Sequence, residues 1–292
     1  MTSHWPRSHL QGLPAQPRQA EGPCGRFELS FGRHGARTHV GRQFVSYPFH
    51  MTRPFALDAA IPSLLTVYQQ SSSGGLYRAE QLTSRYEVGA RAAVHVTTQA
   101  ATVVHDCHGQ AARQATDIVL EEHAFLALTP DPLVLFPGAS FSSTIQARLA
   151  PGAVLFLSDA FGCHDPEGRF RPFDRLGADV VIRDAAGRLL ARDSFEVSGA
   201  QLAGPASPIG AWRAVSNFML LGDRARLPTA EALASLDRTP SVILGTTVLA
   251  NGAGWGVRCL CADAIAARAI SESLFGLAVE AAFGKQPVPR RK

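Results

Sequence analysis

The stretch that decides the fold is Tyr86–Gln99, which reads YEVGARAAVHVTTQ. Apolar or small side chains occupy every second position from Tyr86 to Val96, and this period of two residues is typical of a β-strand with one buried face. Comparable short runs recur between Phe27 and Gly199, separated by turn sequences roughly every ten residues. Because convincing helical periodicity is missing from the same region, the spacing predicts an all-β body.

Two hairpins are predicted nearer the C-terminus, where arms rich in branched apolar residues flank a turn sequence. The first, residues 178–197, turns at Ala185–Gly187, and the second, residues 241–263, turns at Asn251–Gly252. Glycine and asparagine tolerate the positive φ angles of tight hairpin turns. Both segments are therefore expected to be pairs of antiparallel strands.

Two helices are predicted in the last third of the chain. Thr229 is expected to cap a helix near 228–238 and Asp263 a helix near 264–283, because short polar side chains accept hydrogen bonds from the first free N–H groups of a helix. Gly284 is expected to end the second helix. Five residues recur on this helix at helical spacing and are expected to share its buried face: Ile265, Ala269, Leu274, Leu277 and Ala281.

The composition indicates a globular chain that is long enough to bury a substantial core. The chain has 292 residues, of which 46% are hydrophobic, and residues 26–292 are expected to form a single domain. No apolar run reaches the length of about 18 residues that a membrane helix needs, so no membrane partner is predicted. Residues 1–25 are rich in Pro, Gly, Gln and Arg and lack the apolar centre of a signal peptide. They are predicted to be a disordered tail, and the protein is expected in the cytoplasm.

The charge distribution and the cysteine content exclude two further classes of protein. The net charge is +4, but the arginines that carry it are scattered, whereas a nucleic-acid-binding surface needs clustered basic side chains. A nucleic-acid partner is therefore not predicted. The five cysteines are odd in number and irregular in spacing, which argues against a disulfide framework and for reduced thiols; they are Cys24, Cys107, Cys163, Cys259 and Cys261.

Catalytic sequence motifs are missing. The segment GASFS (138–142) lacks the second glycine of a nucleophile elbow, and SSSGGLYRAE (71–80) lacks the Lys-Ser/Thr pair of a phosphate-binding loop. No His-Glu-x-x-His motif, paired Cys-x-x-Cys motif or cofactor fingerprint is present. The chain is therefore not expected to be an enzyme, and no tightly bound cofactor is predicted.

One short segment, HDCH (105–108), gathers metal-binding residue types: His105, Cys107 and His108. In an extended chain, positions 105 and 107 share a face, and imidazole and thiolate groups suit nickel, zinc and copper. One hypothesis is therefore a stand-alone metal-binding β protein, or a metalloenzyme, centred on these three side chains. The alternative is a polar loop after a strand, with Cys107 as an ordinary buried side chain.

The segment VTTQAAT (Val96–Thr102) resembles a signature of the urease accessory protein UreD family, called UreH in some bacteria. The family carries Thr-Thr-Gln-Ala-Ala-Thr followed by a basic residue, Val and Tyr. Val104 agrees with that pattern, whereas Val103 and His105 replace the basic residue and the Tyr. The resemblance is therefore to a divergent member of the family.

Other segments match the same family in the same order along the chain. Arg53–Phe55 resembles an early Arg-Pro-Phe segment, and Gly74–Leu76 resembles the start of a glycine-rich loop. Glu80 stands where the loop of the family has Asp, and Arg78-Ala79 replaces its second pair of glycines. The resemblance covers about residues 41–292 and depends mainly on Thr-Thr-Gln-Ala-Ala-Thr.

The resemblance implies a fold and a function. The fold is a mainly β, coil-like (β-helix-like) body with short helices, including one at the C-terminus. The function is that of a non-enzymatic scaffold that works with UreF and the GTPase UreG to deliver nickel to apo-urease. Nickel would then be a transient cargo, held weakly enough to be released.

The resemblance also implies roles for particular residues. Glu80, Asp106 and Asp131 would line a polar passage for nickel, although a solvated charge at a strand end is the alternative for Glu80. The three side chains of HDCH would be a transient nickel contact. The structural motif would consist of Gly74, Gly75, Leu76, Thr97, Thr98, Gln99, Ala100, Ala101 and Thr102.

Overall fold

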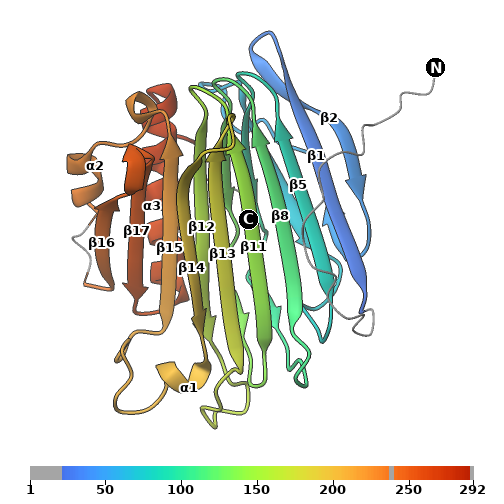
Figure 1. Ribbon diagram of the computed structural model, residues 1–292, viewed down its shortest axis with the longest axis vertical. Helices are drawn as coiled ribbons and strands as arrows, with labels where there is room; N and C mark the ends of the chain where they lie inside the picture. The colour runs from blue at the N-terminus through green and yellow to red at the C-terminus, as the bar shows by residue number, and fades with distance from the viewer. Residues whose placement is uncertain (1–21, 237–239, 290–292) are drawn as a thin grey trace.

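The structure, a computed structural model, describes residues 22–236 and 240–289, and it consists of two facing β-sheets with one long helix on the outside (Figure 1). The first sheet has seven strands in the order β14-β13-β11-β8-β5-β1-β2. These strands are β1 (Cys24–His34), β2 (Arg37–Val45), β5 (Gln81–Val88), β8 (Ala112–Leu120), β11 (Ser140–Leu149), β13 (Arg175–Asp184) and β14 (Leu189–Val197).

The second sheet has ten strands, and its main path runs β16-β17-β15-β12-β9-β6-β4-β3. Off this path, the short strand β10 pairs with both β7 and β12. The strands of this sheet are β3 (Phe49–Met51), β4 (Leu64–Ser71), β6 (Ala93–Thr97), β7 (Thr102–Val104), β9 (Phe125–Thr129), β10 (Leu133–Leu135), β12 (Val154–Cys163), β15 (Ala214–Gly222), β16 (Val242–Val248) and β17 (Gly254–Cys261).

Between β4 and β13 the chain winds from one sheet to the other as a coil. Successive long strands alternate between the sheets, and within each sheet they pair in parallel, as β5 does with β8 and β6 with β9. Each turn of the coil therefore stacks on the previous one through backbone hydrogen bonds. The predicted mainly β, coil-like fold is confirmed.

The stretch Tyr86–Gln99 forms two strands rather than one. β5 ends at Val88, the chain turns a corner, and β6 continues in the opposite sheet. Gly89 N–H donates to the carbonyl of Phe31 at the start of this corner (2.8 Å), and Ala90 is exposed at its tip. The alternation survives because the side chains before and after the corner point into the same core between the sheets: Tyr86, Val88, Ala92, Val94 and Val96.

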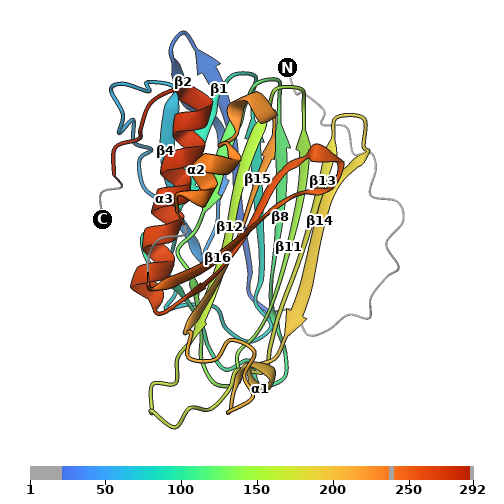
Figure 2. The same ribbon diagram turned by 90° about the vertical axis from the view of Figure 1, so that its left-hand side faces the viewer.

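The helix α3 (Ala264–Phe283) covers the outer face of the second sheet (Figure 2). Asp263 Oδ1 accepts from the N–H of Ala266 (2.8 Å), and Gly284 adopts a left-handed conformation with φ 69°, so both predicted caps are confirmed. The predicted buried face is largely wrong, since Leu274 is buried but Ile265 is 79% exposed. The helix is apolar on most sides, and the sheet beneath it selects the buried residues: Ala266, Ala267, Ile270, Leu274, Phe275, Ala278 and Val279.

The other predicted elements of the last third are present, with shorter helices. Both hairpins are confirmed, as β13 with β14 and β16 with β17. The helix expected near 228–238 is α2 (Ala230–Ala234), capped by Thr229, and residues 237–239 lie outside the described residues. Short helical turns that the sequence did not predict are α1 (Gly199–Leu202), η1 (Arg224–Arg226) and η2 (Ala250–Gly252).

At the N-terminus, β1 begins at Cys24, which lies inside the segment expected to be a tail. Residues 1–21 of that segment are outside the described residues. In the part of the chain that the structure describes, no helix is long and apolar enough to cross a membrane.

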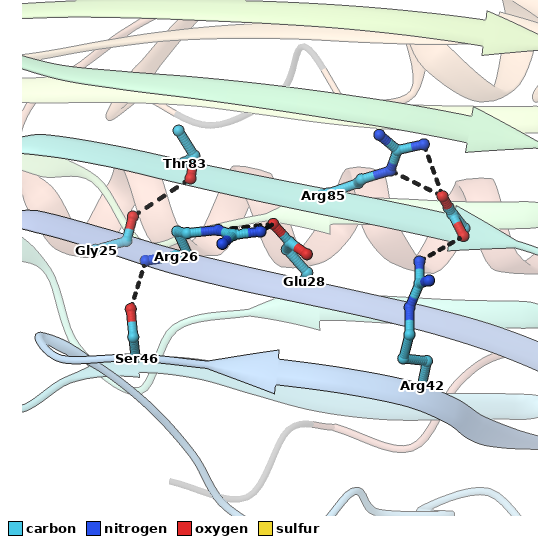
Figure 3. A network of polar contacts seen from close by, with 8 residues as sticks. Gly25, Arg26, Glu28, Arg42, Ser46, Thr83 and Arg85 are labelled. Carbon is cyan, nitrogen blue, oxygen red and sulfur yellow. Dashed lines mark hydrogen bonds and ion pairs between the residues drawn. The ribbon is translucent and has the colours of Figure 1, made fainter. Parts of the chain in front are cut away.

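The outer face of the seven-stranded sheet is polar and carries ion pairs within single strands and, from β2 to β5, across β1 (Figure 3). Arg85 and Arg42 both pair with Glu87, at 2.7 and 3.4 Å, and Arg26 pairs with Glu28 on the same strand. Exposed pairs of this kind contribute little stability, about 0–1 kcal/mol each. They keep this face solvated, while the opposite face of the same sheet packs into the core.

Candidate functional site

The Thr-Thr-Gln-Ala-Ala-Thr segment lies where the second sheet is interrupted. β6 ends at Thr97 and β7 begins at Thr102, and the next turn of the coil has the same interruption between β9 and β10. Thr97 Oγ1 donates to the carbonyl of Thr129 (2.7 Å), and Thr98 Oγ1 accepts from the N–H of Asp131 (2.8 Å). The two hydroxyls therefore satisfy backbone groups that the interrupted sheet leaves without partners.

The middle of the segment faces solvent. Gln99, Ala100 and Ala101 are exposed, and Gln99 Oε1 accepts a hydrogen bond from the side-chain amide of Gln70 at the end of β4. Ala100 and Ala101 present only methyl groups there. The segment therefore connects three successive turns of the coil and presents a short exposed surface beside the connection.

The glycine loop packs directly beside this segment. Leu76 N–H donates to the carbonyl of Val103 (2.8 Å), and His105 N–H donates to the carbonyl of Leu76 (2.9 Å). Gly75 has φ +146°, and a Cβ there would lie 2.4 Å from the carbonyl oxygen of Val103. Only glycine fits this approach, so the two segments that carry the family resemblance are in contact.

The three side chains of HDCH point in different directions. His105 stacks on Tyr77 with ring centroids 4.5 Å apart, whereas Cys107 is fully buried and its thiol donates to the carbonyl of Ser140 (3.2 Å). His108 is exposed, with Nδ1 3.4 Å from Oδ2 of Asp106. Asp106, between the two, bridges to Ala139, and the chain turns only at His108 and Gly109; the expected shared face of positions 105 and 107 does not bring their side chains to one site, because Cys107 is enclosed in the core while His105 packs against Tyr77. Within the described ranges, no three His, Cys, Asp or Glu side chains are grouped so that they could hold a metal ion.

The three carboxylates expected to line a passage occupy three separate places. Glu80 is only 3% exposed, so the alternative of a solvated charge is wrong; burial raises its pKa, while the N–H of Tyr77 donates to it (3.1 Å). Asp106 accepts from the N–H of His108 (2.8 Å). Asp131 is buried beside Thr98. Each lies in a different connection between strands: Glu80 between β4 and β5, Asp106 between β7 and β8, and Asp131 between β9 and β10.

A pocket between the two sheets contains acidic residues that the sequence did not single out. Asp159 on β12 lies opposite Asn217 on β15, which in turn lies opposite Arg258 on β17. Asp193 enters from β14 of the other sheet and pairs with Arg258 Nη2 (2.7 Å). The remaining lining is mostly apolar: Ile145, Leu157, Ser158, Ala178, Val180, Phe195 and Met219.

Asp159 is the most perturbed carboxyl group of this pocket. Burial raises its pKa from 3.8 to about 6, and the negative charge of Asp193 adds to the effect. Asp159 belongs to VLFLSDAF, where an ionisable side chain interrupts an otherwise apolar strand. That interruption could have identified Asp159 from the sequence, because acidic residues are rarely found in buried strands unless they have a functional or structural role.

These observations define a β-coil protein whose recognisable segments hold neighbouring turns together and whose interior contains a mostly apolar pocket with two aspartates. The family described as UreD urease accessory protein matches residues 23–292. The chain is 43% identical to urease accessory protein UreD 1 of Methylorubrum populi over 97% of this chain and 99% of that protein. It is 38% identical to UreD 1 of a Bradyrhizobium species (94% and 96%) and 35% identical to UreD 1 of Pseudomonas syringae (98% and 99%). The chain belongs to the UreD urease accessory protein family.

Proposed function

We propose that this chain is a non-enzymatic scaffold of urease maturation that works in the cytoplasm with UreF and UreG to deliver nickel to apo-urease. The observation that carries the proposal is the family match over residues 23–292. It is supported by relatives that are named urease accessory proteins and align along nearly their whole length.

In this proposal the inter-sheet pocket offers oxygen ligands to a cation in transit. Asp159 and Asp193 supply two carboxylates and Asn217 an amide oxygen, and Arg258 partly offsets the negative charge. A cargo ion must be released, so a site with few charged ligands fits better than a closed cage. Nickel also accepts oxygen ligands, although nitrogen ligands bind it more tightly.

The surface residues of the HDCH segment have a smaller part in this proposal. His105 and His108 reach the surface, while Cys107 is enclosed in the core. A brief contact of nickel with either imidazole is compatible with this arrangement. A tightly held ion shared by all three side chains is not supported by it, and a stand-alone metalloprotein is therefore not proposed.

The test is genetic and biochemical. Deleting the gene is expected to leave urease synthesised but poorly active and poor in nickel, and the wild-type gene is expected to restore both. The tagged protein is expected to co-purify with UreF and, through the complex, with UreG. Fully active urease in the deletion strain, together with no co-purification, would contradict the proposed function.

A further inference from the structure

The loop that joins β12 and β13 presents an unusually exposed aromatic ring. This loop, residues 164–174, lies at the lower end of the molecule in Figure 1. Phe170 is 86% exposed, more than any other large hydrophobic side chain among the described residues. Its φ angle is +57°, a conformation that bulky residues rarely adopt because it brings Cβ too close to the backbone.

The loop is held in this shape by one buried carboxylate. The side chain of Asp165 is 4% exposed and accepts from the backbone N–H groups of Glu167, Arg169 and Arg171 at 3.1, 3.2 and 3.0 Å. The guanidinium group of Arg171 donates to both carboxylate oxygens, at 2.9 and 3.1 Å. These bonds, first of all those from Arg171, hold the pKa of Asp165 well below its usual range.

Both ends of the loop are anchored in the body of the protein. His164 N–H donates to the carbonyl of Leu135 (3.0 Å), and the imidazole lies 5.7 Å from the ring of Phe136. At the other end Phe173 is buried, with its ring 6.5 Å from Phe161 in the core. The loop backbone that carries Phe170 is therefore held at both ends and by the Asp165 contacts between them.

An exposed phenyl ring on a rigid loop raises the free energy of the isolated chain in two ways. The ring forgoes the burial of a large apolar surface, and the backbone is held in a strained conformation, as is common at functional sites. A partner that buries the ring gains the free energy of burying this apolar surface, and the preformed loop reduces the entropy lost on binding. Buried aromatic anchors of this type contribute most of the affinity of many interfaces.

We propose that Phe170 is a docking anchor that inserts into an apolar pocket on a partner protein, and that acidic side chains border this pocket. The acidic border follows from Arg169, whose side chain is 72% exposed beside the phenyl ring. Its pair with Glu167 (3.3 Å) lies in solvent, where such pairs are weak. A carboxylate of the partner can therefore take the place of Glu167.

The test measures binding of the full-length chain to UreF, to the UreF–UreG assembly and to apo-urease, a choice of partners that rests on the proposed function. Phe170→Ala is expected to weaken binding to one of them at least tenfold. The matched control is Ile265→Ala, which removes an almost equally exposed side chain (79%) from the first turn of α3 and is expected to change nothing. Asp165→Ala keeps the ring but releases the loop, and it is expected to weaken the same interaction by a smaller factor.

The outcomes separate the two proposals. If the wild-type chain binds a component and Phe170→Ala binds it equally well, the docking anchor is overturned and the proposed function is not. A wild-type chain that binds none of the three components overturns both. Self-association that Phe170→Ala abolishes, or Phe170-dependent sedimentation with phosphatidylcholine vesicles, assigns the ring to a second copy or to a lipid surface and overturns the partner pocket.

Discussion

Replacing Asp159 by Asn is expected to make the protein more stable at neutral pH. The folded state raises the pKa of this carboxyl group from 3.8 to about 6, so at pH 7.5 folding keeps a charge in an environment that disfavours it. One pKa unit corresponds to about 1.4 kcal/mol, which sets an upper limit of about 3 kcal/mol on this cost. Because Asp159 is not completely shielded from water, the gain expected from Asn is about 1–3 kcal/mol.

The pH dependence gives the prediction its sign. Between about pH 4 and pH 6 the folded carboxyl group binds a proton more readily than the unfolded one, so its contribution to stability falls as the pH rises through this window. The difference between Asp159→Asn and the wild type should therefore be largest above about pH 6.5 and nearly absent at pH 4. Chemical denaturation followed by circular dichroism at both pH values measures it.

A matched control is Asp117→Asn on β8, where the carboxylate is exposed on the outer face of the other sheet. Its effect on the free energy of unfolding should stay within about 0.5 kcal/mol. An Asp159→Asn variant that is no more stable than the wild type at pH 7.5, or whose gain is the same at pH 4, would refute the reasoning. If Asp159 also contacts nickel in transit, the stabilised variant will restore urease activity poorly in the deletion strain, whereas Asp117→Asn will restore it fully.

Three further predictions concern the fold. Gly75→Ala should lower the free energy of unfolding by roughly 3 kcal/mol or more, because the added Cβ meets a backbone carbonyl. Gly35→Ala, which has open space around it, should lower the free energy of unfolding by only about 1 kcal/mol. Urea denaturation of both variants compares these two effects. Leu274→Ala should lower the free energy of unfolding by about 2–5 kcal/mol, whereas Ile265→Ala on the same helix should leave it almost unchanged. Thermal unfolding measures both variants, and equal effects would contradict the assigned buried face. In the native protein the exposed thiols of Cys24 and Cys163 should react first with a thiol reagent. Rapid reaction of the buried thiols before unfolding would contradict their placement in the core: Cys107, Cys259 and Cys261.

Local sequence determined the elements that depend on neighbouring residues. Alternating side chains predicted the β body, and Asp263 and Gly284 marked both ends of α3. The turn at Asn251–Gly252 predicted a hairpin because both residues adopt positive φ angles there, 58° and 64°. These signals act within a few positions along the chain, so they can be recognised without knowledge of the fold.

The family assignment also came from the sequence, through the Thr-Thr-Gln-Ala-Ala-Thr segment, but the purpose of that segment did not. Thr97 and Thr98 act on backbone groups of Thr129 and Asp131, which lie one turn further along the coil. The close approach of Gly75 to Val103 likewise joins residues that are far apart in the sequence. Such contacts depend on which strands pair with each other. A period of two residues predicts which face of a strand is buried, but it does not predict which strand lies beside it.

Only the tertiary structure decided where the chemically notable side chains meet. It enclosed Cys107 in the core and exposed Ile265, and it brought Asp159, Asp193 and Arg258 together from three strands of two sheets. The corner after Val88 likewise placed one alternating stretch in both sheets. The physical reason is the same in each case: burial pattern is encoded locally, whereas the stacking of one turn of the coil on the next depends on contacts between residues far apart in the chain.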